Sequence, residues 1–315
     1  HMDTYGFPKT AYSHLDAIPK QIKLENELPT LIDETRENVH GEEEPYLIFN
    51  NVGAWPVQRT ADRKQDAVYI EVWPPYDRYA SIAQLIRNAR TYAKDDKSII
   101  LAAYLKPFRE GKREKALPAA KLLMGSIVSN GATHLLTGES QTALTQGYYS
   151  DYTKFSDSEA ETIRRYYDYM IRYENLFFDP ELQDVTMTHT GWDNYEYQCT
   201  SHKVSSYGEA GKIWMILREK DYRKCIYLLN LCGQSEDYWN EGKEEPKIQK
   251  NIKFTVQVDT PVERICFSTP DGENMDAVEL PFTERATKTG KFIDFTVPSL
   301  NYWTTIWIDT RKETI

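Results

Sequence analysis

The sequence predicts an α/β half followed by an all-β half. From residue 46 onward, short apolar runs rich in β-branched and aromatic residues alternate with segments of helical periodicity, which indicates a parallel sheet. After Asp179-Pro180 the helical periodicity ends, and the remaining apolar runs are separated by turns and loops, as in antiparallel sheets. We therefore expect two domains, residues 1–179 and residues 180–315.

Four strands are clear in the first half, and we expect them at residues 46–51, 67–73, 98–105 and 133–138. The expected helices are residues 28–39, 81–93, 116–130 and 158–178, whereas the stretch 51–67 shows little helical periodicity. Strands joined by helices form right-handed crossovers. HMD at residues 1–3 adds a fifth strand if it is the end of one. Five are too few to close a (β/α)8 barrel, so this half is predicted to be about the last five strands of one.

The second half is predicted to be an antiparallel β-sandwich. Its expected strands are residues 213–218, 224–232, 252–258, 264–269, 291–298 and 302–309. No segment between them has convincing helical periodicity. The polar stretch 233–247 is expected to be a long loop or hairpin between two of these strands.

Composition excludes several classes of function. The net charge of -10 opposes binding to nucleic acid or to an anionic membrane, so a neutral ligand is the expected partner. No apolar run approaches the roughly 18 residues of a membrane helix. The four cysteines form no CxxC pair, and neither HExxH nor a glycine-rich nucleotide loop occurs. The sequence therefore predicts neither a metal nor a cofactor.

Glu71 is the first candidate catalytic residue. In AVYIEVW, strand alternation directs Val68 and Ile70 one way and Tyr69, Glu71 and Trp73 the other. A carboxylate on a buried strand requires a compensating interaction or a functional role, because burying an unpaired charge costs several kcal/mol. It either forms a structural ion pair or belongs to an active site at the carboxyl ends of the strands.

Asp3 is the candidate partner of Glu71. Aromatic rings beside a carboxylate suit a sugar, and cleavage of a glycosidic bond needs two carboxylates. If HMD ends a strand that precedes residues 46–51, Asp3 lies at the same rim as Glu71. If it does not, Asp3 is a polar residue in a chain end.

Several segments resemble glycoside hydrolase family 66, the dextranases and cycloisomaltooligosaccharide glucanotransferases. In consecutive order they are HMDTYG, FNNVGAWP, AVYIEVWPPYDRY, SIILAAYLKP, THLLTGESQTALTQGYY, RRYYDYMIRYENLFF and KIWMILREKDYRKCIYLLNL. They run through nearly the whole chain. The resemblance implies a retaining endo-hydrolase of α-1,6-glucan (dextran), in which Asp3 is the nucleophile and Glu71 the acid/base.

The resemblance also implies weaker candidates for sugar contacts, namely Asn50, Trp73, His134, Glu139 and Tyr149. Each of the first four has an ordinary alternative. Asn50 could cap or bridge loops, Trp73 could pack, His134 could be a satisfied core residue, and Glu139 could pair with a base.

Two rival functions stay open from the sequence. The family's cyclising glucanotransferases resemble this chain but carry a carbohydrate-binding insertion, and no stretch here is long enough to be one, which favours hydrolysis. A non-catalytic glucan-binding relative is the second rival. The family's first barrel strands are missing from the sequence, so an upstream segment or a second chain is expected to complete the barrel. The polymeric substrate implies an extracellular or periplasmic location.

Overall fold

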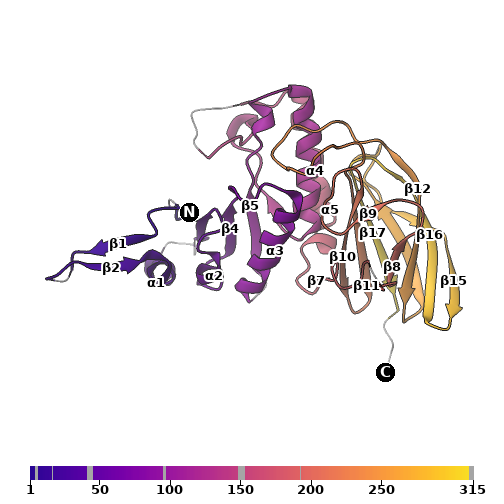
Figure 1. Cartoon of the computed structure of the whole chain (residues 1–315), viewed down its shortest axis with the longest axis horizontal. Helices are drawn as coiled ribbons and strands as arrows, with labels where there is room; N and C mark the ends of the chain where they lie inside the picture. The colour runs from indigo at the N-terminus through magenta and orange to yellow at the C-terminus, as the bar shows by residue number, and fades with distance from the viewer. Residues whose placement is uncertain are drawn as a thin grey trace.

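A four-stranded parallel sheet lies between a small hairpin at one end of the molecule and a β-sandwich at the other (Figure 1). The computed structural model describes residues 1–3, 6–15, 17–40, 45–94, 97–147, 153–191 and 193–311. The parallel sheet has the order β3-β4-β5-β6, with bounds Ile48–Val52, Ala67–Glu71, Ser98–Ala102 and Thr133–His134. All three pairings between these strands are parallel, as expected. The four expected strands are confirmed, but the last three end earlier than predicted.

The first residues of the chain extend this sheet beside β3. Met2 forms a parallel bridge to Phe49. Its amide donates to Ile48 O at 2.8 Å, and its carbonyl accepts from the Asn50 amide at 2.9 Å. The HMD segment therefore pairs as a strand end would. Within the described residues the sheet is open, so its assignment to a (β/α)8 barrel stays a prediction.

Helices lie before, between and after the strands of the parallel sheet along the chain. They are α1 Leu24–Asn38, α2 Val57–Thr60, α3 Tyr79–Ala93, α4 Ala116–Ser129, α5 Asp157–Arg172 and α6 Glu174–Phe177, with 3-10 turns η1 Lys106–Phe108, η2 Arg113–Lys115 and η3 Glu139–Gln141. The four expected helices are present, but the last of them is divided at Tyr173 into α5 and α6. The stretch with little periodicity holds only the single turn α2. Val68 and Ile70 of β4 pack with α3 in the core, whereas Tyr69 and Glu71 face a cavity.

A hairpin of β1 Thr10–Ser13 and β2 Lys20–Lys23 was not predicted from the sequence. It projects from the end of the molecule in Figure 1, and β2 leads directly into α1. The strands have four residues each and are mostly exposed. Strands that bury almost no side chains leave no alternation of apolar and polar residues to detect.

The second half is a sandwich of two sheets, as expected. One sheet has the order β14-β13-β17-β11-β10-β7, with β9 beside β10, and the other has the order β15-β16-β12-β8. Their bounds are β7 Gln183–Asp184, β8 Tyr197–Cys199, β9 Val204–Ser205, β10 Ile213–Lys220, β11 Arg223–Asn230, β12 Gln249–Val258, β13 Val262–Ser268, β14 Val278–Leu280, β15 Phe282–Thr287, β16 Gly290–Leu300 and β17 Trp303–Thr310. The six expected strands are present, and among the residues described here every pairing is antiparallel except that of the short β9 with β10.

The apolar core is continuous between the helices and the sandwich. Helix α4 packs against β11 and β17. At Gly125 of α4 an added Cβ would lie 2.7 Å from Leu229 Cδ2 and 3.1 Å from Trp303 Cγ, so glycine allows a close approach. The division at residues 179 and 180 stays a prediction. Among the described helices, none has the length and apolar character needed to cross a membrane.

Candidate active site

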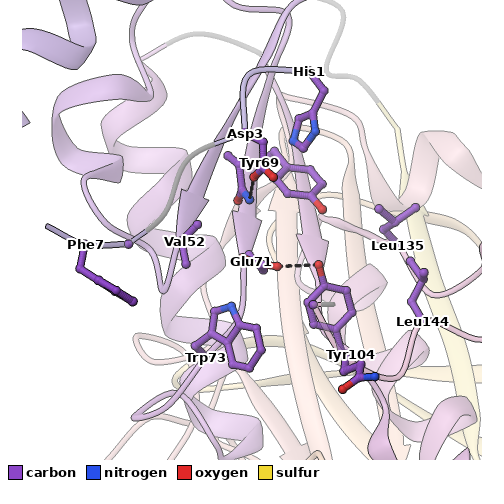
Figure 2. Close-up of a pocket in the computed structure, with 14 residues that line it drawn as sticks. His1, Asp3, Phe7, Val52, Tyr69, Glu71, Trp73, Tyr104, Leu135 and Leu144 are labelled. Atoms are coloured by element: carbon purple, nitrogen blue, oxygen red, sulfur yellow. Dashed lines mark hydrogen bonds between the residues drawn. The ribbon is translucent and has the colours of Figure 1, made fainter. Parts of the chain in front are cut away.

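A cavity of about 530 Å³ lies at the carboxyl ends of β3, β4 and β5 (Figure 2). Its wall is formed by residues of β3 and β4, by residues that follow β4, β5 and β6, by the first residues of the chain and by the segment before residue 148. They are His1, Asp3, Gly6, Phe7, Asn50, Val52, Tyr69, Glu71, Trp73, Tyr104, Leu135, Leu144, Gln146 and Gly147. Side chains at this end of a parallel sheet converge because neighbouring strands end at one edge.

Asp3 faces this cavity because of its register against β3. Met2 pairs with Phe49, so strand alternation turns Asp3 to the opposite face, where Asn50 and Tyr69 lie. The side-chain amide of Asn50 donates through Nδ2 to Asp3 Oδ1 at 2.8 Å. This hydrogen bond orients the carboxylate and stabilises its negative charge.

Glu71 ends β4 and is 9% exposed. The Tyr104 hydroxyl donates to Glu71 Oε1 at 2.7 Å (Figure 2). Burial, together with this hydrogen bond to Glu71, raises the pKa of Tyr104 well above its usual range. Tyr104 therefore remains a neutral donor at any pH at which the protein works. No ion pair of Glu71 with a base occurs among the described residues, so the predicted structural ion pair is not found there, and the catalytic role of Glu71 stays a prediction.

Aromatic and apolar side chains form much of the remaining wall. The rings of Trp73 and Tyr104 lie 5.9 Å apart at 58°. Phe7 is 74% exposed on another side of the cavity. The indole Nε1 of Trp73 is buried and has no hydrogen-bond partner among the described residues. The site thus offers flat apolar faces of the kind that bind a sugar ring.

Gly147 brings a loop close to Glu71. A Cβ at this position would lie 3.0 Å from Glu71 Oε1 and 2.9 Å from Trp73 Cζ2. Distances this short exclude a side chain unless the neighbours move. The loop therefore closes over the carboxylate only because residue 147 is glycine.

The other predicted sugar contacts are not all brought into the cavity. His134 is 1% exposed, and its Nε2 lies 2.9 Å from Ala103 O. Burial lowers its pKa from 6.5 to about 4, so the ring is neutral and donates this bond. Glu139 is exposed in η3, and neither residue lines the cavity. Tyr149 lies outside the described residues.

Four cavity residues with polar groups, His1, Tyr69, Tyr104 and Gln146, were missed from the sequence, and two of them had a signal that could have found them. Tyr69 precedes Glu71 by two positions and therefore shares its face of β4. Tyr104 follows β5 closely, at the edge where active-site residues gather. Both residues could therefore have been predicted to line the cavity from their positions relative to the expected strands. Contacts from Gly147 and Leu144 had no such signal, because the path of a loop is not encoded in a repeating pattern.

The described residues contain no group of three or more His, Cys, Asp and Glu side chains that could hold a metal ion. The chemistry available in this cavity comes from its two carboxylates. One is held by an amide donor and the other by a phenol donor. Two carboxylates beside an apolar and aromatic surface can provide a nucleophile and a proton donor for cleavage of a glycosidic bond.

Comparison with known proteins assigns a family. The family model described as glycosyl hydrolase family 66 matches residues 1–307. Two cycloisomaltooligosaccharide glucanotransferases from Niallia circulans are similar in sequence. One is 28% identical over 193 residues and the other 26% identical over 191 residues. Each match covers 60% of this chain but only 19% of the relative, so the chain spans about a fifth of the length of these curated relatives.

A solved structure shares the fold. It is the crystal structure of a cycloisomaltooligosaccharide glucanotransferase from Paenibacillus sp., complexed with cycloisomaltoheptaose. The TM-score is 0.81 at 15% sequence identity, and the match covers 91% of this chain and 59% of the other. The arrangement of helices, parallel strands and sandwich therefore also occurs in that protein.

Proposed function

Because the chain belongs to glycosyl hydrolase family 66, we propose that it acts on an α-1,6-linked glucan by glycosyl transfer, with cyclisation of the glucan as the main reaction. The observation that carries this proposal is the meeting of Asp3 and Glu71 in one cavity beside Trp73. The carboxylates supply the chemistry, and the ring supplies a stacking surface for glucose.

Cyclisation is preferred to the endo-hydrolysis that the sequence favoured. The similar proteins are named cycloisomaltooligosaccharide glucanotransferases. The two reactions share their first half and differ only in the acceptor, which is the far end of the same glucan chain or water. A choice of acceptor depends on the surroundings of the carboxylates rather than on the carboxylates themselves.

In the proposed mechanism Asp3 attacks the anomeric carbon. The hydrogen bond from Asn50 occupies Oδ1, so Oδ2 is the attacking atom. The bond from the anomeric carbon to the leaving oxygen breaks as the bond to Oδ2 forms, and a glycosyl ester results. Asn50 holds Asp3 in the geometry required for attack.

Glu71 acts twice in the same scheme. It first donates its proton to the leaving oxygen, which takes the electron pair of the broken bond. As a carboxylate it then removes the proton from a glucan 6-hydroxyl, which attacks the ester and regenerates Asp3. The configuration at the anomeric carbon is retained after the two displacements.

Hydrolysis is the second candidate, and one observation favours it. Between β3 and β6 the connections consist of single helices and short turns, without an inserted domain in the described residues. The resemblance to cyclising members of the family implies such an insertion. The proposed assignment of the sheet to a (β/α)8 barrel and the extracellular or periplasmic location apply to both candidates.

Product analysis distinguishes the candidates. The full chain is incubated with dextran, and the products are weighed by mass spectrometry. Cyclisation gives oligosaccharides lighter than the linear ones by one water, whereas hydrolysis gives linear isomaltooligosaccharides. Glu71→Gln should lose roughly 100- to 10,000-fold in turnover of dextran. The exposed Glu139→Gln variant is the matched control and should retain it. A chain that releases no products of either kind contradicts both candidates.

A further inference from the structure

The hydroxyl of Tyr104 and the backbone at Gly147 enclose one oxygen of Glu71. Tyr104 donates to Oε1 at 2.7 Å. A Cβ at Gly147 would lie 3.0 Å from the same atom. Oε2, in contrast, has no hydrogen bond to another described residue. The two oxygens of this carboxyl group are therefore in different surroundings.

We infer that Tyr104 is a positioning residue that fixes which oxygen of Glu71 carries the transferred proton. With Oε1 accepting from the phenol, the proton resides on Oε2. The inference rests on the proposed function, because it requires Glu71 to be the acid/base. Tyr104 acts through Glu71 and needs no contact with the glucan.

The Tyr104 hydroxyl can donate its hydrogen bond to Glu71 Oε1 in every step of the proposed reaction. In the acid step Oε1 is the carbonyl oxygen of a carboxylic acid and accepts a neutral hydrogen bond. When Oε2 gives its proton to the leaving oxygen, Glu71 becomes a carboxylate, and the bond from Tyr104 becomes charge-assisted. The hydroxyl thus stabilises the state that forms as the glycosidic bond breaks, without moving.

A purely structural role is the alternative, because the Tyr104 ring also lies 5.9 Å from that of Trp73. Tyr104→Phe separates the two roles, since it keeps the ring and removes only the hydroxyl. Tyr46→Phe is the matched control, because Tyr46 is 89% exposed and does not line the cavity.

The experiment compares kcat/KM for two substrates of the full chain. An isomaltooligosaccharide has a poor leaving group that needs a proton, whereas isomaltosyl fluoride releases fluoride with little need of one. In Tyr104→Phe we expect kcat/KM to fall by about 100-fold for the oligosaccharide, the loss typical of a misplaced catalytic group, and to change little for the fluoride.

A double-mutant cycle gives the second readout. In the Glu71→Gln background no proton is available to position, so adding Tyr104→Phe should cost nothing further on the oligosaccharide. Equal losses on both substrates, or a full further loss in the Glu71→Gln background, would overturn the inference. So would a Tyr104→Phe variant with unchanged kinetics.

Failure of the proposed function is recognised separately. A wild-type chain inactive on both substrates contradicts that function and leaves the hydrogen bond to be tested directly. Carbon-13 NMR of the Glu71 side-chain carboxyl then serves as the measurement. Its chemical shift should differ between Tyr104→Phe and the wild type at the same pH, because the hydrogen bond to Oε1 is lost, and an unchanged chemical shift rejects the role assigned to Tyr104.

Discussion

At the scale of residues, the site depends on groups that orient its two carboxylates. Asn50 holds Asp3, and Tyr104 holds Glu71, each through one hydrogen bond from a neutral donor. Glu71 could be selected from the sequence, because a carboxylate at the end of a buried strand has a recognisable position, whereas Asp3 was selected only through the family resemblance. Tyr104 could not be ranked above the other tyrosines, because the sequence does not show which side chain reaches Glu71.

Gly147→Ala tests the close approach of the loop to Glu71. The new Cβ would lie 3.0 Å from Glu71 Oε1 and 2.9 Å from Trp73 Cζ2, so either the loop or the two side chains must shift. A displacement near 1 Å costs about 100-fold in turnover of glucan. Steady-state kinetics measure this loss, and thermal unfolding serves as the control. A variant with wild-type turnover would show that the approach of Gly147 does not matter.

His134 predicts a pH dependence of stability. Its pKa is lowered by burial from 6.5 to about 4, so the folded protein keeps it neutral while the unfolded chain takes up a proton below pH 6.5. Its contribution to the free energy of unfolding is complete above pH 6.5 and is lost as the pH falls toward 4. At about 1.4 kcal/mol per pH unit, the loss is about 3 kcal/mol.

Urea unfolding of the wild type and of His134→Gln between pH 4.5 and 7.5 measures this contribution. Glutamine can still donate to Ala103 O but does not titrate, so the difference between the two proteins should grow with pH in favour of the wild type. Subtraction removes the titration of all other groups. A difference that stays constant across this range would show that His134 is not neutral by burial.

At the scale of elements, the loop 233–247 links the sandwich to the rim of the parallel sheet. Its existence was predicted from its polar sequence, but its contacts were not. Trp239 donates through Nε1 to Tyr76 O at 2.6 Å, and Asp237 O accepts from the Tyr79 amide at 3.0 Å. The loop thereby fixes the segment that follows Trp73. Such contacts depend on how two distant parts of the chain pack, which no local pattern reveals.

Trp239→Ala tests this link. Trp239 is 3% exposed, so its removal should lower the free energy of unfolding by about 3–5 kcal/mol. The segment after Trp73 should also loosen and raise KM for glucan. Chemical denaturation and steady-state kinetics measure the two effects, and Trp239→Phe, which keeps most of the ring volume, is the milder control. If the Trp239→Ala protein is destabilised but its KM for glucan is unchanged, the loop does not influence glucan binding.

At the scale of the whole molecule, the change from α/β to all-β was predictable because helical periodicity ends near residue 179. The apolar core that the two halves share could not be predicted from the sequence. Helix α4 uses Gly125 to approach Leu229 and Trp303, and an isolated glycine in a helix is not by itself a packing signal. The contacts of loop 233–247 escaped prediction because they depend on tertiary packing. The hairpin β1–β2 escaped for a different reason, since its exposed strands bury too few side chains to give an alternating pattern.

Gly125→Leu tests whether the two halves unfold together. A leucine overlaps Leu229 and Trp303 and should lower the free energy of unfolding by about 1–3 kcal/mol or more. Because one apolar cluster contains residues of both halves, calorimetry should show a single transition at a lower temperature. Gly125→Ala is the milder control, since its Cβ requires the flexible end of Leu229 to move and Trp303 to give by only a few tenths of an ångström. Two separate transitions in the wild type would show that the halves unfold independently.

The central claim is that Asp3 attacks the glycosyl group while Glu71 donates the proton. The most direct measurement incubates Glu71→Gln with isomaltosyl fluoride and maps the labelled peptide by mass spectrometry. The fluoride allows the first step without an acid, and the missing base delays the second. The account predicts a glycosyl ester on Asp3. An ester on another carboxylate, or none while fluoride is released, would contradict it.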